Sequence, residues 1–276
     1  MSEETFYRKC FIHTKGWIPM NPLRNKAFLG DFFQIQNKQM CTYGNVNQLP
    51  DFQKVSTKDD MFILNEYDWK IQDDVHQLFC EKIIDDRYEN TSYTKEILEF
   101  TNSGSFLFFG VKPRAESISN WNEISESLIL KLTQSDFSFR ELYIVSAVAK
   151  MTNYTLAIAD KPGAQLEFIA NSDASEFYDL LSDPTCEITK RTKISHFDKH
   201  LENPIYFFKA KKLVLKLKKR EELLKKIMEV SGPNYFKSWY DGDLLNHVKS
   251  NDLNVTTCLD FFEWAETSLD DVEKLY

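Results

Sequence analysis

The stretch ELYIVSAVAKMTNYTLAIAD, residues 141–160, decides what kind of fold to expect from this chain. Its first arm is apolar on both faces, and its second arm carries large apolar residues on one face and small ones on the other. A strand that crosses a membrane needs about 9–11 residues, and a face that lines a pore is polar at every second residue. These arms are shorter than that and lack the alternation. We therefore predict a hairpin that turns near Thr152 and Asn153, with its first arm a central strand covered on both sides.

The rest of the chain predicts an α+β fold, a twisted and mainly antiparallel sheet with surrounding helices and a C-terminal helical segment. Of its 276 residues 42% are hydrophobic, which suffices for a sizeable core, while 8 glycines and 8 prolines are too few for an all-β sandwich. Alternating patterns predict a hairpin that turns at Asn37 and Lys38, and strands at 103–113 and 165–170. Three- and four-residue spacings predict helices at 71–86, at 119–135 with Ser119 or Asn120 as N-cap, at 174–182 and at 257–275.

Charge and cysteine content exclude several classes of protein. A net charge of −8 argues against a nucleic-acid partner for the molecule as a whole. The five cysteines are widely spread without a CxxC pair, which favours reduced thiols over a zinc site. The N-terminus lacks the apolar core of a signal peptide, and no apolar run approaches the ~18 residues of a spanning helix. We expect a chain made as a soluble protein in the cytoplasm.

No motif in the sequence predicts catalysis. His196 and His200 in HFDKH are four residues apart, but without a helical apolar pattern or a third nearby ligand we expect a surface loop there. The paired acids are adjacent in sequence and are typical of solvated faces. GxSxG, a P-loop and a glycine-rich dinucleotide turn are all missing. The sequence therefore predicts a protein that is not an enzyme, with no catalytic residues, cofactor or metal.

The strongest signal is an asymmetry of charge near the C-terminus. Residues 209–226 hold nine basic residues against two acidic ones, and residues 260–273 hold six acidic residues and no basic one. The predicted acidic helix also has an apolar stripe that must be buried, so it is expected to dock over the basic segment. The alternative is that both are solvated faces with ordinary i,i+4 ion pairs. The basic residues are Lys209, Lys211, Lys212, Lys216, Lys218, Lys219, Arg220, Lys225 and Lys226, and the stripe is Leu259, Phe262, Leu269 and Val272.

Several segments, in order, resemble gasdermins, a family of pore-forming proteins. GWIPMNPL followed by FFQIQNKQMCTYGNVNQL resembles the N-terminal strands of the family, and ELYIVSAVAKMTNYTLAI resembles an internal pair of strands. HLENPIYFFKAKKLVL resembles the late strand that ends the pore-forming domain. The layout is closest to bacterial gasdermins, since only ~60 residues follow Leu217. The family's Thr-Glu pair is replaced here by Ser146 and Ala147.

This resemblance implies a division into a pore-forming domain, residues 1–218, and a helical inhibitory segment, residues 219–276. It implies a monomer at rest, cleavage by a protease between Ser231 and Thr256, and then oligomers whose β-hairpins insert into the inner membrane and kill a phage-infected cell. The basic segment would bind anionic lipid, and the apolar stripe would make the autoinhibitory contacts. Cys10 is the candidate for the acylated cysteine of bacterial members. The inserting hairpins stay unassigned, with 105–113 and 141–160 as alternatives.

A different class of function fits the same sequence. A soluble α+β interaction module, such as an immunity or adaptor protein, would use the last helices to bind a partner and would have no membrane activity.

Overall fold

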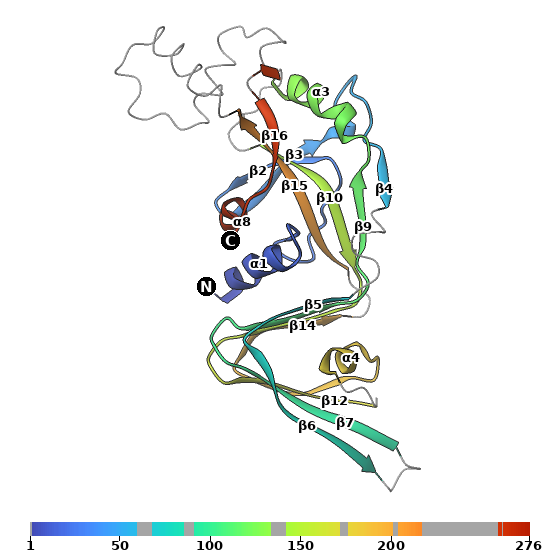
Figure 1. Cartoon of the computed structure of the whole chain (residues 1–276), viewed down its shortest axis with the longest axis vertical. Helices are drawn as coiled ribbons and strands as arrows, with labels where there is room; N and C mark the ends of the chain where they lie inside the picture. Colours follow the sequence, from blue (N-terminus) through green and yellow to red (C-terminus); the bar gives the residue numbers. More distant parts are fainter. Residues whose placement is uncertain are drawn as a thin grey trace, which may run out of the picture.

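The protein is described by a computed structural model that covers residues 2–59, 68–85, 91–133, 142–171, 176–200, 204–216, 259–260 and 262–276. Three antiparallel sheets follow one another along an elongated molecule (Figure 1). Sheet A contains β1 (Ile18–Pro19), β2 (Asp31–Gln36), β3 (Gln39–Asn45), β4 (Thr57–Asp59), β9 (Arg114–Ile118), β10 (Tyr143–Met151), β15 (Ile205–Leu215) and β16 (Phe262–Glu266). Sheet B contains β5 (Trp69–Asp73), β8 (Phe106–Gly110), β11 (Tyr154–Ala159) and β14 (Ile194–His200). Sheet C contains β6 (Val75–Asp85), β7 (Thr91–Phe100), β12 (Ala164–Ala170) and β13 (Glu187–Thr192). The α+β fold class is confirmed.

The chain runs along this stack in both directions. From β10 in sheet A it passes through β11 in sheet B to β12 and β13 in sheet C, and it returns through β14 to β15. The passages between sheets B and C lie side by side: the Asp160 N–H donates to the Lys193 carbonyl, and the Thr101 N–H donates to the Asp74 carbonyl. Lys193 and Asp74 both have positive φ angles, 56° and 52°, which let the chain change direction within one residue. The sheets are thus successive levels of one long, bent ribbon of strands.

The predicted hairpin at 141–160 has the expected strands but the wrong pairing. β10 pairs with β15, β9 and β2 in sheet A, whereas β11 pairs with β8 and β14 in sheet B. Thr152 and Asn153 therefore form a corner between two sheets and not a reversing turn. Both strands are central and buried, as predicted for the first arm.

Each level is completed by helices. The 13-residue helix α3 (Trp121–Thr133) packs on one face of sheet A through Ile124, Leu128 and Leu132, which confirms the predicted helix and its apolar stripe. Helix α1 (Ser2–His13) packs on sheet B. Helix α4 (Phe177–Ser182) contributes Leu180 and Leu181 to the core between sheets B and C. Two further helical segments are the 3-10 helix η1 (Val46–Gln48) and helix α8 (Leu269–Glu273), which lies beside α1 (Figure 1).

Three expectations about local structure are wrong. The predicted helix at 71–86 is the end of β5 followed by β6, and its supposed apolar stripe is divided, since Val75 is buried while Leu78 and Phe79 are exposed. A bulge between Gln77 and Phe79 shifts the strand register by one residue. The apolar residues on either side of it therefore have the three- and four-residue spacing of a helix. HFDKH lies in strand β14 and not in a loop. The helix predicted at 257–275 contains strand β16 and the short helix α8.

Two further predictions are confirmed. The hairpin of β2 and β3 turns at Asn37 and Lys38, which have φ angles of 50° and 62° as a two-residue turn requires. The predicted strands at 103–113 and 165–170 contain β8 and β12. Within the described residues, no helix is both long and apolar enough to cross a membrane.

Candidate functional site: a terminal strand paired with a basic strand

The basic segment of the sequence begins in β15, which alternates between the two faces of sheet A. Leu213 is buried against α3, and Ala210 is buried on the opposite face. The four lysines of this strand and of the residue after it are Lys209, Lys211, Lys212 and Lys216, all half-buried. The other members of the predicted basic segment, Lys218, Lys219, Arg220, Lys225 and Lys226, lie outside the described residues.

Strand β16 is hydrogen-bonded along one edge of the second half of β15. The pairing is antiparallel and in continuous register, from Lys211 opposite Glu266 to Leu215 opposite Phe262. The first half of the same edge is occupied by β1, since Ile18 is opposite Phe208. β16 therefore extends sheet A from the far end of the sequence and covers an edge of β15 that would otherwise be unpaired.

The described residues 259–260 and 262–276, which include β16 and α8, are called the terminal segment below. Three lysines in β15 or directly after it bind to this segment. Lys211 Nζ donates to Glu266 Oε1, the residue directly opposite it in the register. Lys212 Nζ lies 2.7 Å from Asp271 Oδ1, and Lys216 Nζ lies 2.7 Å from the Leu259 carbonyl oxygen. Because Glu266 is well exposed, its ion pair adds little stability. The pair of Lys212 and Asp271 is much less exposed and is the stronger attachment.

Asp271 is the centre of a small buried network at the start of α8. Its carboxylate accepts from the Tyr143 hydroxyl at 2.7 Å and from Lys212 Nζ, and it caps the helix by accepting from Ser268 N–H and Oγ. Burial acts to raise the pKa of Asp271, but the hydrogen bonds from Lys212, Ser268 and Tyr143 outweigh it and hold the pKa at about 2. The carboxylate is therefore charged, paired and almost completely covered.

The predicted apolar stripe divides between the two faces of sheet A. Phe262 packs with Leu213 in the core beneath α3, where Leu259 is partly buried. Val272 packs on the other face with Tyr143. Leu269 is half-buried and belongs to neither of these clusters. The four residues thus do not form one stripe, because a strand and a separate helix present them in place of a single helix.

Two aromatic residues of the terminal segment were not predicted as contacts. Trp264 Nε1 donates to the Ser125 carbonyl of α3 at 3.0 Å, and its ring meets the Trp121 ring edge-on at 5.6 Å. Tyr276 stacks on Tyr7 of α1, with ring centroids 3.5 Å apart and an interplanar angle of 6°. Aromatic residues in a polar segment were the signal that could have identified both.

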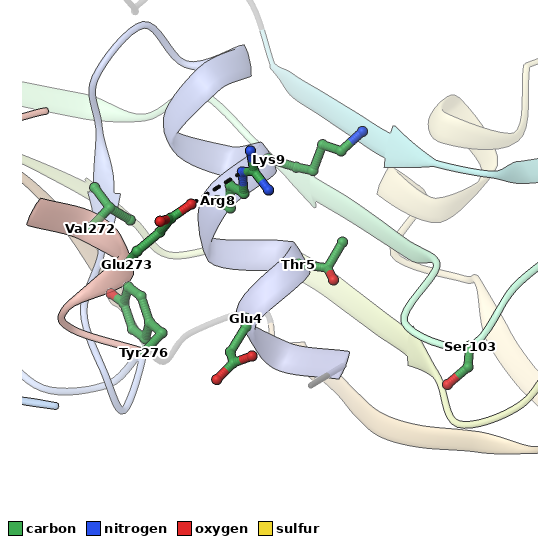
Figure 2. A pocket seen from close by; sticks show the side chains of 8 residues that line it. All are labelled: Glu4, Thr5, Arg8, Lys9, Ser103, Val272, Glu273 and Tyr276. Atoms are coloured by element: carbon green, nitrogen blue, oxygen red, sulfur yellow. Dashed lines mark ion pairs between the residues drawn. The ribbon is translucent and has the colours of Figure 1, made fainter. Parts of the chain in front are cut away.

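The contact between α1 and the terminal segment is extensive (Figure 2). The Tyr276 hydroxyl donates to the Pro19 carbonyl, and Lys38 Nζ donates to the Tyr276 backbone oxygen. Arg8 pairs with Glu273 at 3.5 Å. A cavity of about 690 Å³ lies along this contact, and its lining includes Arg8, Glu273 and Tyr276. The terminal segment thus links sheet A to α1, which in turn packs on sheet B.

Comparison with known proteins adds one remote likeness. No protein-family model matches the sequence, and no curated protein matches it. Among solved structures, a bacterial gasdermin from Bradyrhizobium tropiciagri is similar, with a TM-score of 0.35 and 11% identity. The match covers 78% of this chain and 88% of that chain. A likeness to gasdermins at this level is weak and carries no argument about function.

Cys10, the predicted acylation candidate, is a core residue. It lies in α1 with no exposed surface, in the cluster that joins this helix to sheet B. Desolvation raises the pKa of its thiol far above the usual range, so the reactive thiolate is suppressed. In this conformation Sγ is out of reach of an acyl donor, and acylation of Cys10 would need α1 to move.

The predicted boundary between residues 218 and 219 lies outside the described residues, as does the predicted cleavage region between Ser231 and Thr256.

Proposed function

We propose that this protein is an autoinhibited pore-forming protein that permeabilises an anionic membrane once its terminal segment has been removed. One observation carries the proposal: β16 occupies an edge of β15, while Glu266 and Asp271 bind two of its lysines. A single segment therefore covers both a strand edge and a row of positive charge. Its removal would expose the two together.

The uncovered edge supports self-association. Residues 211–215 of β15 are hydrogen-bonded to β16 on that side, so loss of β16 leaves a row of unpaired N–H and C=O groups. Such an edge is a template for pairing with another chain. The same segment would then keep the protein monomeric at rest and permit homo-oligomers after release.

The uncovered lysines support attraction to a membrane. Each lysine near an anionic lipid surface contributes about 1 kcal/mol. Lys211, Lys212 and Lys216 are engaged by the terminal segment, and its removal takes away Glu266 and Asp271 with it. The activated protein would bind the cytoplasmic face of the inner membrane, after residing in the cytoplasm at rest.

Sheet C supplies strands of the length needed to cross a membrane. β6 has 11 residues and β7 has 10, in the range of about 9–11 residues that a spanning strand requires. β6 is an edge strand with exposed Leu78 and Phe79. In contrast, 106–109 and the strands at 141–160 are buried core. The hairpin of β6 and β7 is therefore our candidate for insertion.

Proteolysis would activate the protein through loss of tethering. A terminal segment that is part of the chain has a high effective concentration at its binding surface, and cutting the chain before residue 259 removes that advantage. The partners would be an activating protease and anionic lipid, and the outcome would be permeabilisation of the cell's own membrane in defence against infection.

The decisive experiment measures dye leakage from vesicles. A recognition sequence for a specific protease is placed between residues 231 and 256, and the intact and cut proteins are added to vesicles with and without anionic lipid. Trp264 fluorescence reports separately whether the cut segment has left sheet A. We expect leakage only from anionic vesicles and only after the cut. A cut protein that has released its segment but leaves the vesicles intact would contradict the proposal and favour the interaction module.

A further inference from the structure

A second cavity lies beside β15, on the side away from Asp271. Its volume is about 570 Å³, within the usual range for small-molecule sites. The loop after α1 contributes Trp17, β9 contributes Ser117, and the start of α3 contributes Trp121. β10 contributes Ser146, where a bulge shifts its register, and β15 contributes Lys209 and Lys211. Five separate parts of sheet A and its surroundings thus meet around one cavity.

The two lysines are held in place by aromatic rings. Lys209 Nζ lies 5.2 Å from the centre of the Trp17 ring and donates to the Lys15 carbonyl at 3.1 Å. Lys211 Nζ lies 5.3 Å from the centre of the Trp121 ring and donates to Glu266. Because they are two positions apart on one strand, they share a face and are about 7 Å apart along it. That spacing suits one anion between two ammonium groups.

Two further donors belong to residues that line the cavity. Within the part of the chain that the structure describes, Trp17 Nε1 and Ser117 Oγ make no hydrogen bond, and both atoms are covered by their neighbours. Leaving a buried donor unsatisfied costs about 1–3 kcal/mol, so native proteins rarely keep one without a reason. Both residues line the cavity together with Lys209 and Lys211, which donate to the Lys15 carbonyl and to Glu266 in the free protein.

We propose that this cavity binds a phosphomonoester, whose phosphate bridges Lys209 and Lys211 and, once the wall atoms that cover them move aside, accepts from Ser117 Oγ and Trp17 Nε1. A phosphomonoester carries up to two charges and three terminal oxygens, which matches this number of donors better than a carboxylate does. The aromatic walls accommodate its organic part. Among the described residues that line the cavity, Glu266 is the one carboxylate, and it occupies Lys211.

Binding therefore competes with the terminal strand. A phosphate that binds Lys211 displaces Glu266. This ion pair contributes little stability because the Glu266 side chain is exposed. Occupancy of the cavity and attachment of β16 at this end are then coupled, and each weakens the other by the same factor. The binding site itself does not depend on whether the protein forms pores.

The test uses phenyl phosphate as a soluble probe and vesicles that contain phosphatidic acid as a lipid probe. The indole N–H resonance of Trp17, assigned with Trp17→Phe, is followed by NMR in the full-length protein. We expect a downfield shift as this donor gains an acceptor. A shift with phenyl phosphate identifies a soluble ligand, and a shift with the vesicles alone identifies a lipid headgroup. An unchanged resonance with both probes overturns the proposal.

Two variants break the same ion pair but should change affinity in opposite directions. Lys211→Gln removes a ligand contact and should weaken binding about tenfold, as Lys209→Gln should. Glu266→Gln removes the competitor and should strengthen binding. Lys190→Gln, an exposed position on β13, is the matched control and should leave affinity unchanged. If Lys211→Gln and Glu266→Gln shift the affinity in the same direction, the cavity is not the site.

Ser117→Ala separates a binding role from a structural one. Because the hydroxyl has no partner among the residues that the structure describes, its removal should raise the melting temperature slightly. The same substitution should weaken phenyl phosphate binding. A variant that is less stable and binds as well as the original would show that Ser117 serves the fold alone.

Discussion

Lys212 and Asp271, far apart in sequence, form a 2.7 Å ion pair in which the Asp271 side chain is only 6% exposed. The lysine belongs to the basic strand β15 and the aspartate to the short helix α8 that follows β16. Tyr143 of β10 donates to the same carboxylate oxygen, so three segments of the chain converge on one atom. This ion pair adds a buried polar attachment to the backbone pairing of β16 with β15.

Removing this carboxylate should destabilise the protein. Asp271→Asn leaves Lys212 without its ionic partner, and loss of one member of a buried pair costs about 3 kcal/mol. Urea unfolding at pH 7 measures the change. Asp270→Asn, its exposed neighbour in α8, is the control and should change the free energy of unfolding by under about 0.5 kcal/mol. Equal effects of the two substitutions would contradict the importance of the network.

The same carboxylate should make the fold sensitive to acid. The pKa of Asp271 is about 2 in the folded protein against 3.8 ordinarily, so its ionised form favours folding. This contribution of about 2 kcal/mol is complete above pH ~4 and is lost as the pH falls toward 2. Unfolding measured across this range should show a component that Asp271→Asn abolishes. If the variant loses stability between about pH 4 and pH 2 as the original protein does, Asp271 is not the cause of that loss.

Glu96 should have the opposite pH dependence. This residue of β7 has no exposed surface, and burial raises its pKa to about 7 although a hydrogen bond from Gln77 acts in the opposite direction. Because the folded pKa exceeds the ordinary 4.5, the carboxyl group increasingly destabilises the fold as the pH rises from about 4.5 to 7. Glu96→Met should therefore stabilise the protein by about 1–3 kcal/mol at pH 8 and much less at pH 4. Glu81→Met, at an exposed position on β6, controls for added hydrophobicity.

The stacked rings of Tyr7 and Tyr276 should be energetically coupled. Each tyrosine is changed to leucine singly and then both together, and unfolding free energies give the interaction between them. We expect a coupling of about 1 kcal/mol, as for other aromatic pairs. Strictly additive effects would mean that the two rings stabilise the fold independently of each other.

The corner between sheets A and B should not tolerate a side chain at Gly110. A Cβ added there would collide with Met151 Sδ, which is buried at the end of β10. Gly110→Ala should cost about 1–3 kcal/mol in the free energy of unfolding. Met151→Ala removes the obstacle, so the double variant should lose less than the sum of the two single losses. If the loss in the double variant equals the sum of the two single losses, the cost of Gly110→Ala does not come from Met151.

Local patterns in the sequence predicted the elements that are decided locally. Helix α3 has a regular stripe at Ile124, Leu128 and Leu132, and the turn at Asn37 and Lys38 has alternating strands on each side. Both interpretations are confirmed. In contrast, the 71–86 segment contains a bulge, so its apolar residues recur at three- and four-residue spacing although they lie in a strand.

Pairing between distant segments could not be read in this way. Nothing near residue 262 shows that its strand partner lies at residue 215, because the partner is chosen by the edge that β15 leaves open. The acid-rich composition did predict an attachment to the basic segment, and Lys211 and Lys212 make it. The orphan donors Trp17 and Ser117 had no sequence signal, since their lack of partners exists only after folding.

The stacking of Tyr276 on Tyr7 also sets an order of events during synthesis. Tyr7 is translated long before Tyr276, and the described strands all lie between the two, so the side of α1 that Tyr276 covers stays uncovered during that interval. Contacts between residues so far apart in sequence form late and slowly. The nascent polypeptide consequently displays β15 without β16 before it can display the two together. A chaperone that binds the polypeptide during that interval would keep this open edge of β15 from pairing with other chains.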